Sequence, residues 1–158
     1  ILGFTFFSAQ ATTHQVLSLS DSGPYTLRMQ IANAFYGDTI RLYSGLIATG
    51  SDTIFLSSPI TIAKGITIKG AYSATDTLYI SGNNTTFIFN INYASAVFLD
   101  SLAFINGKNN DPYNGGAISC GNTDSLIINN CLFKSNKCGY TRGPLLGPEG
   151  LVVVLAPS

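Results

Sequence analysis

The sequence predicts an all-β fold: a right-handed parallel β-helix (a β-solenoid) with a short N-terminal capping helix. Short runs of Ile, Leu and Phe recur between Gly and Asn residues, and only one Glu and one Met occur in 158 residues. Strong helix formers are therefore scarce, while strand and turn formers abound. Similar segments also return along the chain, at Ile60–Gly70, Val97–Gly107 and Gly115–Asn136. Such units bury their apolar sides only by stacking on one another.

The composition limits which partners and sites can be expected. Apolar residues make up 46% of the chain and charged residues 10%, and eight basic side chains balance eight acidic ones. Without a basic stripe, nucleic acid is not an expected partner. No apolar run is long enough for a membrane-spanning helix. The one histidine, His14, is far from the cysteines in sequence, so no metal site and no cofactor is predicted.

The first element is interpreted as part of a secretory signal. Ile1–Phe7 is apolar, and Ser8-Ala9-Gln10-Ala11 has the small-x-small pattern of a cleavage site. Residues 1–11 are therefore read as a partial signal peptide cut after Ala11, with a buried strand over Leu2–Phe7 as the alternative. Export to the extracellular space or cell surface follows. His14, next to this site, is expected in a flexible N-terminal position.

The next elements form the predicted cap. Val16–Leu19 is read as a strand and is followed by a turn. Leu27, Ile31 and Ala34 recur at i, i+4 and i+7, so a helix is predicted over about 26–35, with Thr26 as its N-cap. This helix is expected to cover the exposed edge of the first coil.

The rest of the solenoid, within a domain at 12–138, is predicted as short strands bounded by Gly, Asn, Asp or Ser. Ile66, Ile68 and Gly70 align with Leu102, Phe104 and Asn106 at a spacing of 36, and Leu99, Leu102 and Phe104 align with Ile128, Cys131 and Phe133 at 29. An antiparallel β-sandwich is the competing fold, but two-residue hairpin turns are nearly absent. The predicted strands are Thr39–Leu42, Thr53–Leu56, Ile60–Ile62, Ile66–Lys69, Leu78–Ser81, Phe87–Ile91, Ala96–Leu99, Leu102–Ile105, Ala117–Cys120, Leu126–Asn129 and Cys131–Lys134.

The three cysteines, Cys120, Cys131 and Cys138, are odd in number and cannot form a closed disulfide framework. Cys120 and Cys131 are expected to lie on neighbouring strands, so one disulfide is possible in an exported protein. The favoured interpretation is that they are small apolar residues, since Cys131 aligns with Leu102. Residues 139–158 lack the repeat; we expect truncation within a longer protein or a non-native tail, with Leu151–Leu155 as a covering strand being the alternative.

Two segments resemble known families. The run from Asp21-Ser22-Gly23-Pro24 through Leu27-Arg28 to Gly37-Asp38-Thr39-Ile40 resembles the opening of exported bacterial right-handed parallel β-helix proteins. Gly115-Gly116-Ala117-Ile118 and Phe133-x-x-Asn136 resemble the GGAI and FxxN repeats of polymorphic outer-membrane proteins. The resemblance implies a secreted or surface-displayed, adhesin-like β-helix.

Several patterns are candidates for catalytic or metal sites. Asn122-Thr123-Asp124 matches a motif of polygalacturonase-like hydrolases, but glycoside hydrolysis needs a second carboxylate, so a polar corner is favoured. A lyase would need a base, for which Lys64, Lys69, Lys134 and Lys137 are available, and calcium ligands at 109–111; a solvated loop insertion is favoured there. Scattered threonines (Thr61, Thr67, Thr85, Thr86) are read as strand formers rather than an ice-binding ladder.

The sequence therefore favours a non-enzymatic, adhesin-like stalk or binding surface, whose partners would be polysaccharide, a neighbouring cell surface or further coils of its own solenoid. The alternatives are the N-terminal part of a polysaccharide-degrading enzyme with its catalytic residues in downstream coils, and a carbohydrate-binding module. Aromatic rings stack on sugars. The candidate sugar-binding residues are Tyr72, Tyr79, Tyr93 and Tyr113.

Overall fold

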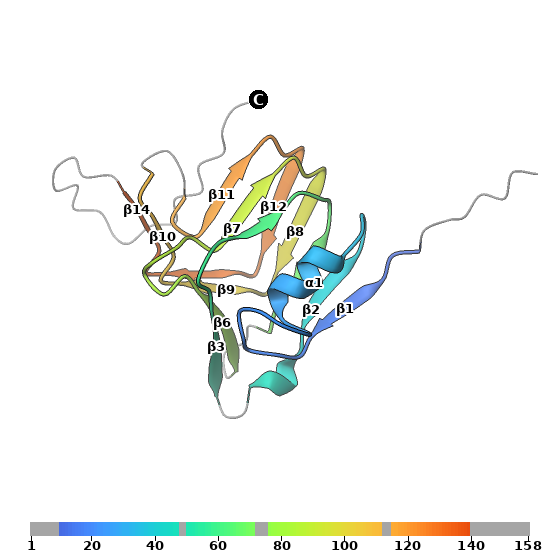
Figure 1. Cartoon of the computed structure of the whole chain (residues 1–158), viewed down its shortest axis with the longest axis horizontal. Coiled ribbons are helices and arrows are strands. Elements are labelled where there is room, and N and C mark those ends of the chain that lie inside the picture. Colours follow the sequence, from blue (N-terminus) through green and yellow to red (C-terminus); the bar gives the residue numbers. More distant parts are fainter. Residues whose placement is uncertain (1–9, 48–49, 72–75, 112–114, 140–158) are drawn as a thin grey trace, which may run out of the picture.

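The computed structural model describes residues 10–47, 50–71, 76–111 and 115–139. Within them the chain forms a parallel β-solenoid of about four coils with one α-helix near the N-terminal end (Figure 1). Every strand pairing in the described residues is parallel, so the β-sandwich alternative is wrong. The elements are β1 Thr13–Val16, α1 Leu27–Asn33, β2 Thr39–Leu42, a 3₁₀ turn η1 Ser44–Leu46, β3 Ser51–Phe55, β4 Ile60–Ile62, β5 Thr67–Lys69, β6 Thr77–Ser81, β7 Phe89–Asn92, β8 Ala96–Asp100, β9 Ala103–Ile105, β10 Lys108–Asn109, β11 Ile118–Gly121, β12 Ser125–Asn129, β13 Leu132–Lys134 and β14 Lys137–Cys138.

Three stacked sheets form the walls of the solenoid. The first sheet has the order β1-β2-β5-β8-β12, the second β13-β9-β6-β3 and the third β11-β7-β4, with a small extra pair β10-β14. Each coil therefore passes through the first, second and third sheets in turn before the next coil stacks on it. The 29-residue spacing is confirmed, because Leu99 pairs with Ile128 and Phe104 with Phe133. The spacing of 36 is wrong: Ile68 pairs with Leu99, whereas Phe104 pairs with Ile80.

The core is a column of aliphatic and aromatic side chains inside these walls. Phe104 lies at its centre with no exposed surface. Its ring centroid lies 5.4 Å from that of Phe89, which it meets edge-on, and 5.0 Å from that of Phe133, on which it stacks. Each residue belongs to a different sheet or coil, so the rings connect coils as well as walls.

Corners between the sheets depend on residues that tolerate positive φ. Asn106, Asn122 and Asn130 have φ of 52°, 46° and 50°, as expected for a residue that enters the left-handed region easily. Tyr93 and Ser101 occupy the corners that precede Asn122 and Asn130 by one coil, with φ of 56° and 55°. Corner geometry thus repeats from coil to coil even where the residue type changes.

The predicted cap is confirmed, with a shorter helix than expected. Helix α1 packs on β1 and β2, and its residues Leu27 and Ile31, with its C-cap Ala34, belong to the buried core (Figure 1). The hydroxyl of Thr26 accepts from the amide of Met29 at 3.3 Å, which confirms the N-cap.

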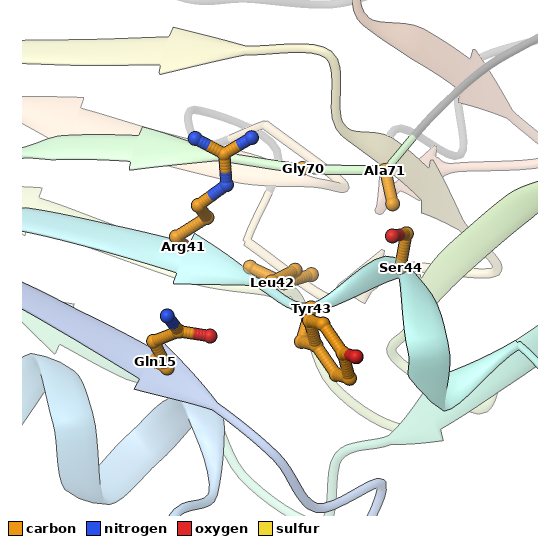
Figure 2. A pocket seen from close by; sticks show the side chains of 7 residues that line it. All are labelled: Gln15, Arg41, Leu42, Tyr43, Ser44, Gly70 and Ala71. Atoms are coloured by element: carbon orange, nitrogen blue, oxygen red, sulfur yellow. The ribbon is translucent and has the colours of Figure 1, made fainter.

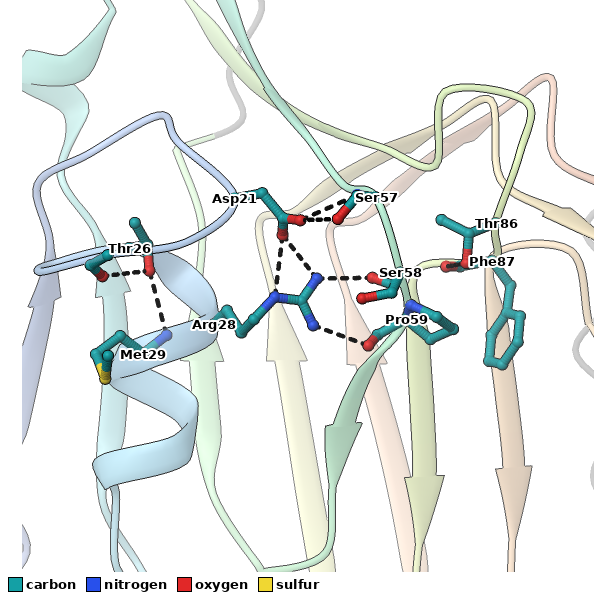
Figure 3. A network of polar contacts seen from close by, with 10 residues as sticks. Asp21, Thr26, Arg28, Met29, Ser57, Ser58, Pro59, Thr86 and Phe87 are labelled. Carbon is teal, nitrogen blue, oxygen red and sulfur yellow. Dashed lines mark hydrogen bonds and ion pairs between the residues drawn. The ribbon is translucent and has the colours of Figure 1, made fainter.

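Polar contacts fix both ends of α1 to the first coil, and Figure 3 shows those at its N-terminal end. Arg28 binds the carboxylate of Asp21 at 2.6 Å and donates to the carbonyls of Ser58 and Pro59, between β3 and β4. Burial alone would raise the pKa of Asp21, but hydrogen bonds from Ser57 and Arg28 hold the pKa below its ordinary value. At the other end Lys64 donates to the carbonyls of Ala32 and of the C-cap Ala34.

The first strand differs from its prediction. We expected Val16–Leu19, but β1 spans Thr13–Val16 and pairs along its whole length with β2. His14 therefore lies in a strand, and the expectation of a flexible N-terminal position is wrong. The predicted signal segment and the predicted tail lie mostly outside the described residues, as does a strand over Leu151–Leu155.

Candidate functional site

A depression lies on the outer face of the first sheet, at the end of β2 (Figure 2). It encloses about 320 Å³, at the lower end of the range for small-ligand sites. Strands β1 and β2, the turn η1 and the segment after β5 contribute to it. Its lining residues are Gln15, Arg41, Leu42, Tyr43, Ser44, Gly70 and Ala71.

Strand alternation places a column of polar side chains beside this depression. Ile40 and Leu42 of β2 are buried, so Arg41 between them points outward. In-register pairing stacks Gln15, Arg41 and Lys69 on neighbouring strands of the first sheet, and Asp100 and Asn129 follow. Parallel strands lie about 4.8 Å apart, so successive members of this outward column are close neighbours.

Two of these side chains are cations without an ionic partner in the described part of the chain. The ion pairs recorded between described residues join His14 to Asp38 and Arg28 to Asp21. Arg41 and Lys69 are both exposed. Asp100 is one strand beyond Lys69, but no ion pair joins them. The end of the column at β2 and β5 is therefore free to bind an anion.

An aromatic ring lines the same depression as Arg41. Tyr43 is 51% exposed and follows Leu42 directly. A Cβ atom added at Gly45 would lie 2.3 Å from the ring of Tyr43, so the absence of a side chain at Gly45 lets this ring lie against η1. The depression thus combines the ring of Tyr43, the guanidinium of Arg41 and the polar side chains of Gln15 and Ser44. Lys69 does not line it, but pairs in register with Arg41 on the next strand.

A second depression of about 440 Å³ lies on the third sheet and supplies mainly amides. The side-chain oxygen of Asn92 is buried there without a hydrogen bond. One carboxylate, that of Asp111, lines it, and no lysine or arginine does. Its lining residues are Phe87, Asn90, Asn92, Asn109, Asp111, Ser119, Cys120, Gly121 and Asn122.

Of the tyrosines predicted to bind sugar, the two that the structure describes are not brought together. Tyr79 faces outward from β6 in the second sheet, whereas Tyr93 is 73% exposed at the corner between β7 and β8. Tyr72 and Tyr113 lie outside the described residues. Sequence reasoning missed Tyr43 and Arg41, because only the register shows that they flank one depression.

The repeat motif has a structural role in both of its halves. A Cβ at Gly116 would lie 2.4 Å from the backbone of Lys137, so only glycine permits this approach of successive coils. Gly115, Ala117 and Ile118 are buried around it. Asn136 accepts from the amide of Gly107 at 2.8 Å and donates to the carbonyl of Phe104 at 3.0 Å. This side chain therefore connects the third and fourth coils.

The other candidate sites are corners and turns in the structure. In Asn122-Thr123-Asp124, the hydroxyl of Thr123 donates to the carbonyl of Gly121 and the amide of Asp124 donates to that of Ala94, which confirms the polar corner. The side chain of Asn109 accepts from the amide of Asp111, as in an Asx turn. Among the described residues no group of three or more His, Cys, Asp and Glu side chains is placed to hold a metal.

The cysteines are free thiols, and Cys120 and Cys131 are partly buried against the core. The expectation that these two lie on neighbouring strands is wrong. Cys120 pairs with Ile91 in the third sheet, while Cys131 is at the corner between the first and second. Burial raises the pKa of the Cys131 thiol.

Comparison with protein-family models, curated proteins and solved structures found no match to this chain. In the described residues, no helix has the length and apolar character needed to cross a bilayer. The geometry of the solenoid and its depressions is therefore the basis for a functional proposal.

Proposed function

We propose that this chain is part of an exported, non-enzymatic β-helix that serves as an adhesin-like stalk and binds acidic polysaccharide on its first sheet. The observation that supports binding is the depression that Arg41 lines together with the exposed ring of Tyr43, with Lys69 paired in register to Arg41 on the next strand. The parallel strands hold the two backbones about 4.8 Å apart, so both side chains can reach one ligand.

The chemistry of the depression suits a sugar carboxylate. Arg41 can bind a carboxylate through two parallel hydrogen bonds, and Lys69 supplies a second charge to the next sugar along a chain. The ring of Tyr43 offers a flat apolar face for a pyranose ring. Gln15 and Ser44 provide donors and acceptors for hydroxyl groups. A uronic-acid polymer carries all of these complementary groups.

Affinity measurements with polygalacturonate and with fully methyl-esterified pectin test this proposal, because esterification removes the carboxylate charge but keeps the sugar. We expect binding to polygalacturonate that weakens with salt, and much weaker binding to the ester. The double variant Arg41→Gln/Lys69→Gln removes two exposed charge contacts worth about 2 kcal/mol together, or roughly 30-fold in Kd.

A matched control is available on the same solenoid. Lys108 and Lys137 also pair in register, on β10 and β14, and Lys108→Gln/Lys137→Gln makes the same change in net charge. We expect this control to keep nearly full affinity, because β10 and β14 form a separate pair outside the first sheet, on which the depression beside Tyr43 lies. Equal losses in both double variants would reduce the interaction to nonspecific charge attraction. Release of cleaved sugars from polygalacturonate would establish the enzymatic alternative instead.

A further inference from the structure

The carboxylate of Asp38 is nearly inaccessible, with the residue 3% exposed, at the junction of α1 and β2. Its two oxygens accept from the amide of Thr12 at 2.8 Å, the amide of Phe35 at 2.7 Å and the ring of His14 at 2.8 Å. These hydrogen bonds, those from Phe35 and Thr12 foremost, lower the pKa of Asp38 to about 2. Asp38 is thus a built anionic site at the start of the solenoid.

Thr12 is where the described chain first joins the fold. Its amide binds Asp38, and its carbonyl accepts from the amide of Thr39 at 2.9 Å. The preceding residues Gln10 and Ala11 are exposed and belong to no helix or strand. The bond between Ala11 and Thr12 therefore lies at the boundary between an accessible segment and strand β1.

The cleavage position that the sequence predicts is this same bond between Ala11 and Thr12. Ala9-Gln10-Ala11 fits the small-x-small rule for cleavage after Ala11. Hydrolysis there adds water across the peptide bond, leaving a carboxylate on Ala11 and an amino group on Thr12. That amino group contains the nitrogen that already lies 2.8 Å from Asp38.

We propose that cleavage between Ala11 and Thr12 creates an α-ammonium group that binds the carboxylate of Asp38 and secures strand β1. An α-amino group has a pKa of about 7.7–8.0, so it is mostly protonated at neutral pH. A neutral amide donor would thereby become a charged one, and charge-assisted hydrogen bonds are the stronger kind. Among the described residues, His14 is the one ionisable donor to Asp38, and the other donors are backbone amides. This inference is independent of the depression beside Tyr43.

Thermal unfolding of three chains with different first residues tests the proposal: the full chain, a chain that begins at Thr12 and a chain that begins at Ala11. The last has the same free amino group displaced by one residue, so it is the matched control. We expect the Thr12 chain to melt about 3 °C above both others. Enzymatic acetylation of its amino group should remove the difference, as should Asp38→Asn introduced into all three chains.

The acetylation measurement keeps the proposal testable if Asp38→Asn does not fold. Equal melting temperatures for the Thr12 and Ala11 chains would overturn the ammonium–carboxylate contact, as would a difference that survives acetylation. N-terminal sequencing of the exported protein tests the cleavage position, with Thr12 as the expected first residue. Any other first residue would overturn processing at this bond.

Discussion

Replacing Phe104 with alanine should destabilise the solenoid more than any change at an exposed aromatic position. Phe104 is fully buried and contacts the rings of Phe89 and Phe133. Truncation of a buried Phe costs about 3–5 kcal/mol, and each aromatic pair accounts for about 0.5–1.5 kcal/mol. Because Phe104→Ala removes two such pairs and leaves a cavity between coils, we expect a loss of about 4 kcal/mol.

Two further variants give reference values for this loss of unfolding free energy. Phe133 is only partly buried and has one ring partner, so Phe133→Ala should cost about 2 kcal/mol. Phe55 is 57% exposed, and Phe55→Ala should change the stability by about 0.5 kcal/mol or less. Phe104→Leu, which keeps most of the volume, provides a milder change if the alanine variant does not fold.

Urea unfolding followed by circular dichroism measures the free energies, and equal m-values would show that the same surface unfolds in each variant. Tyrosine fluorescence offers a second probe, because the chain has eight Tyr and no Trp. Coincident curves from the two probes would justify a two-state treatment, which repeat proteins do not always obey. A Phe104→Ala loss no larger than that of Phe55→Ala would refute the stacked aromatic core.

Three further predictions concern contacts between coils and at the N-terminal end. Asn136→Ala removes the bonds to Gly107 and Phe104 and should cost about 1–2 kcal/mol by urea unfolding, whereas a neutral result would contradict the connecting role. Gly116→Ala forces a Cβ against the backbone of Lys137 and should speed hydrogen exchange in β14; unchanged exchange would argue against the close approach. The lowered pKa of Asp38 stabilises the fold above the unfolded pKa of 3.8, and this contribution is lost as the pH falls towards about 2. Acid unfolding should therefore begin in this window, and the stability of Asp38→Asn should depend less on pH there. Acid curves that coincide for the two proteins would oppose this assignment.

The strands of the solenoid could be predicted because its walls alternate buried and exposed residues. Ile60 and Ile62 are buried with exposed Thr61 between them, a pattern legible in the sequence alone. The corners at Asn106 and Asn122 were also readable, since Asn tolerates positive φ. Corners at Tyr93 and Ser101 carry no such signal, because the stacked strands on either side impose their conformation.

Register was harder to predict than strand position. The loop between β5 and β6 differs in length from that between β8 and β9, so strands with similar apolar patterns align equally well at a wrong spacing. This explains why Ile68 was matched to Phe104 rather than to Leu99.

The polar strand β1 was placed too late in the sequence for a related reason. Thr13–Val16 has one buried residue, Val16, and gains its order from pairing with β2 and from Asp38. Neither partner is apparent from local sequence. The depression beside Tyr43 was missed likewise, because Arg41 and Lys69 become neighbours only through the strand register.

Disulfide trapping between β2 and β5 tests most directly the claim that parallel stacking places Arg41 beside Lys69. Thr39 pairs with Thr67 in the same register, so Thr39→Cys/Thr67→Cys, with the three native cysteines replaced by serine, should oxidise readily. Arg41→Cys/Thr67→Cys is displaced by two residues, at about 8 Å between Cα atoms, and should not. Efficient crosslinking of the displaced pair, or failure of the in-register pair, would contradict the stacking on which the binding proposal depends.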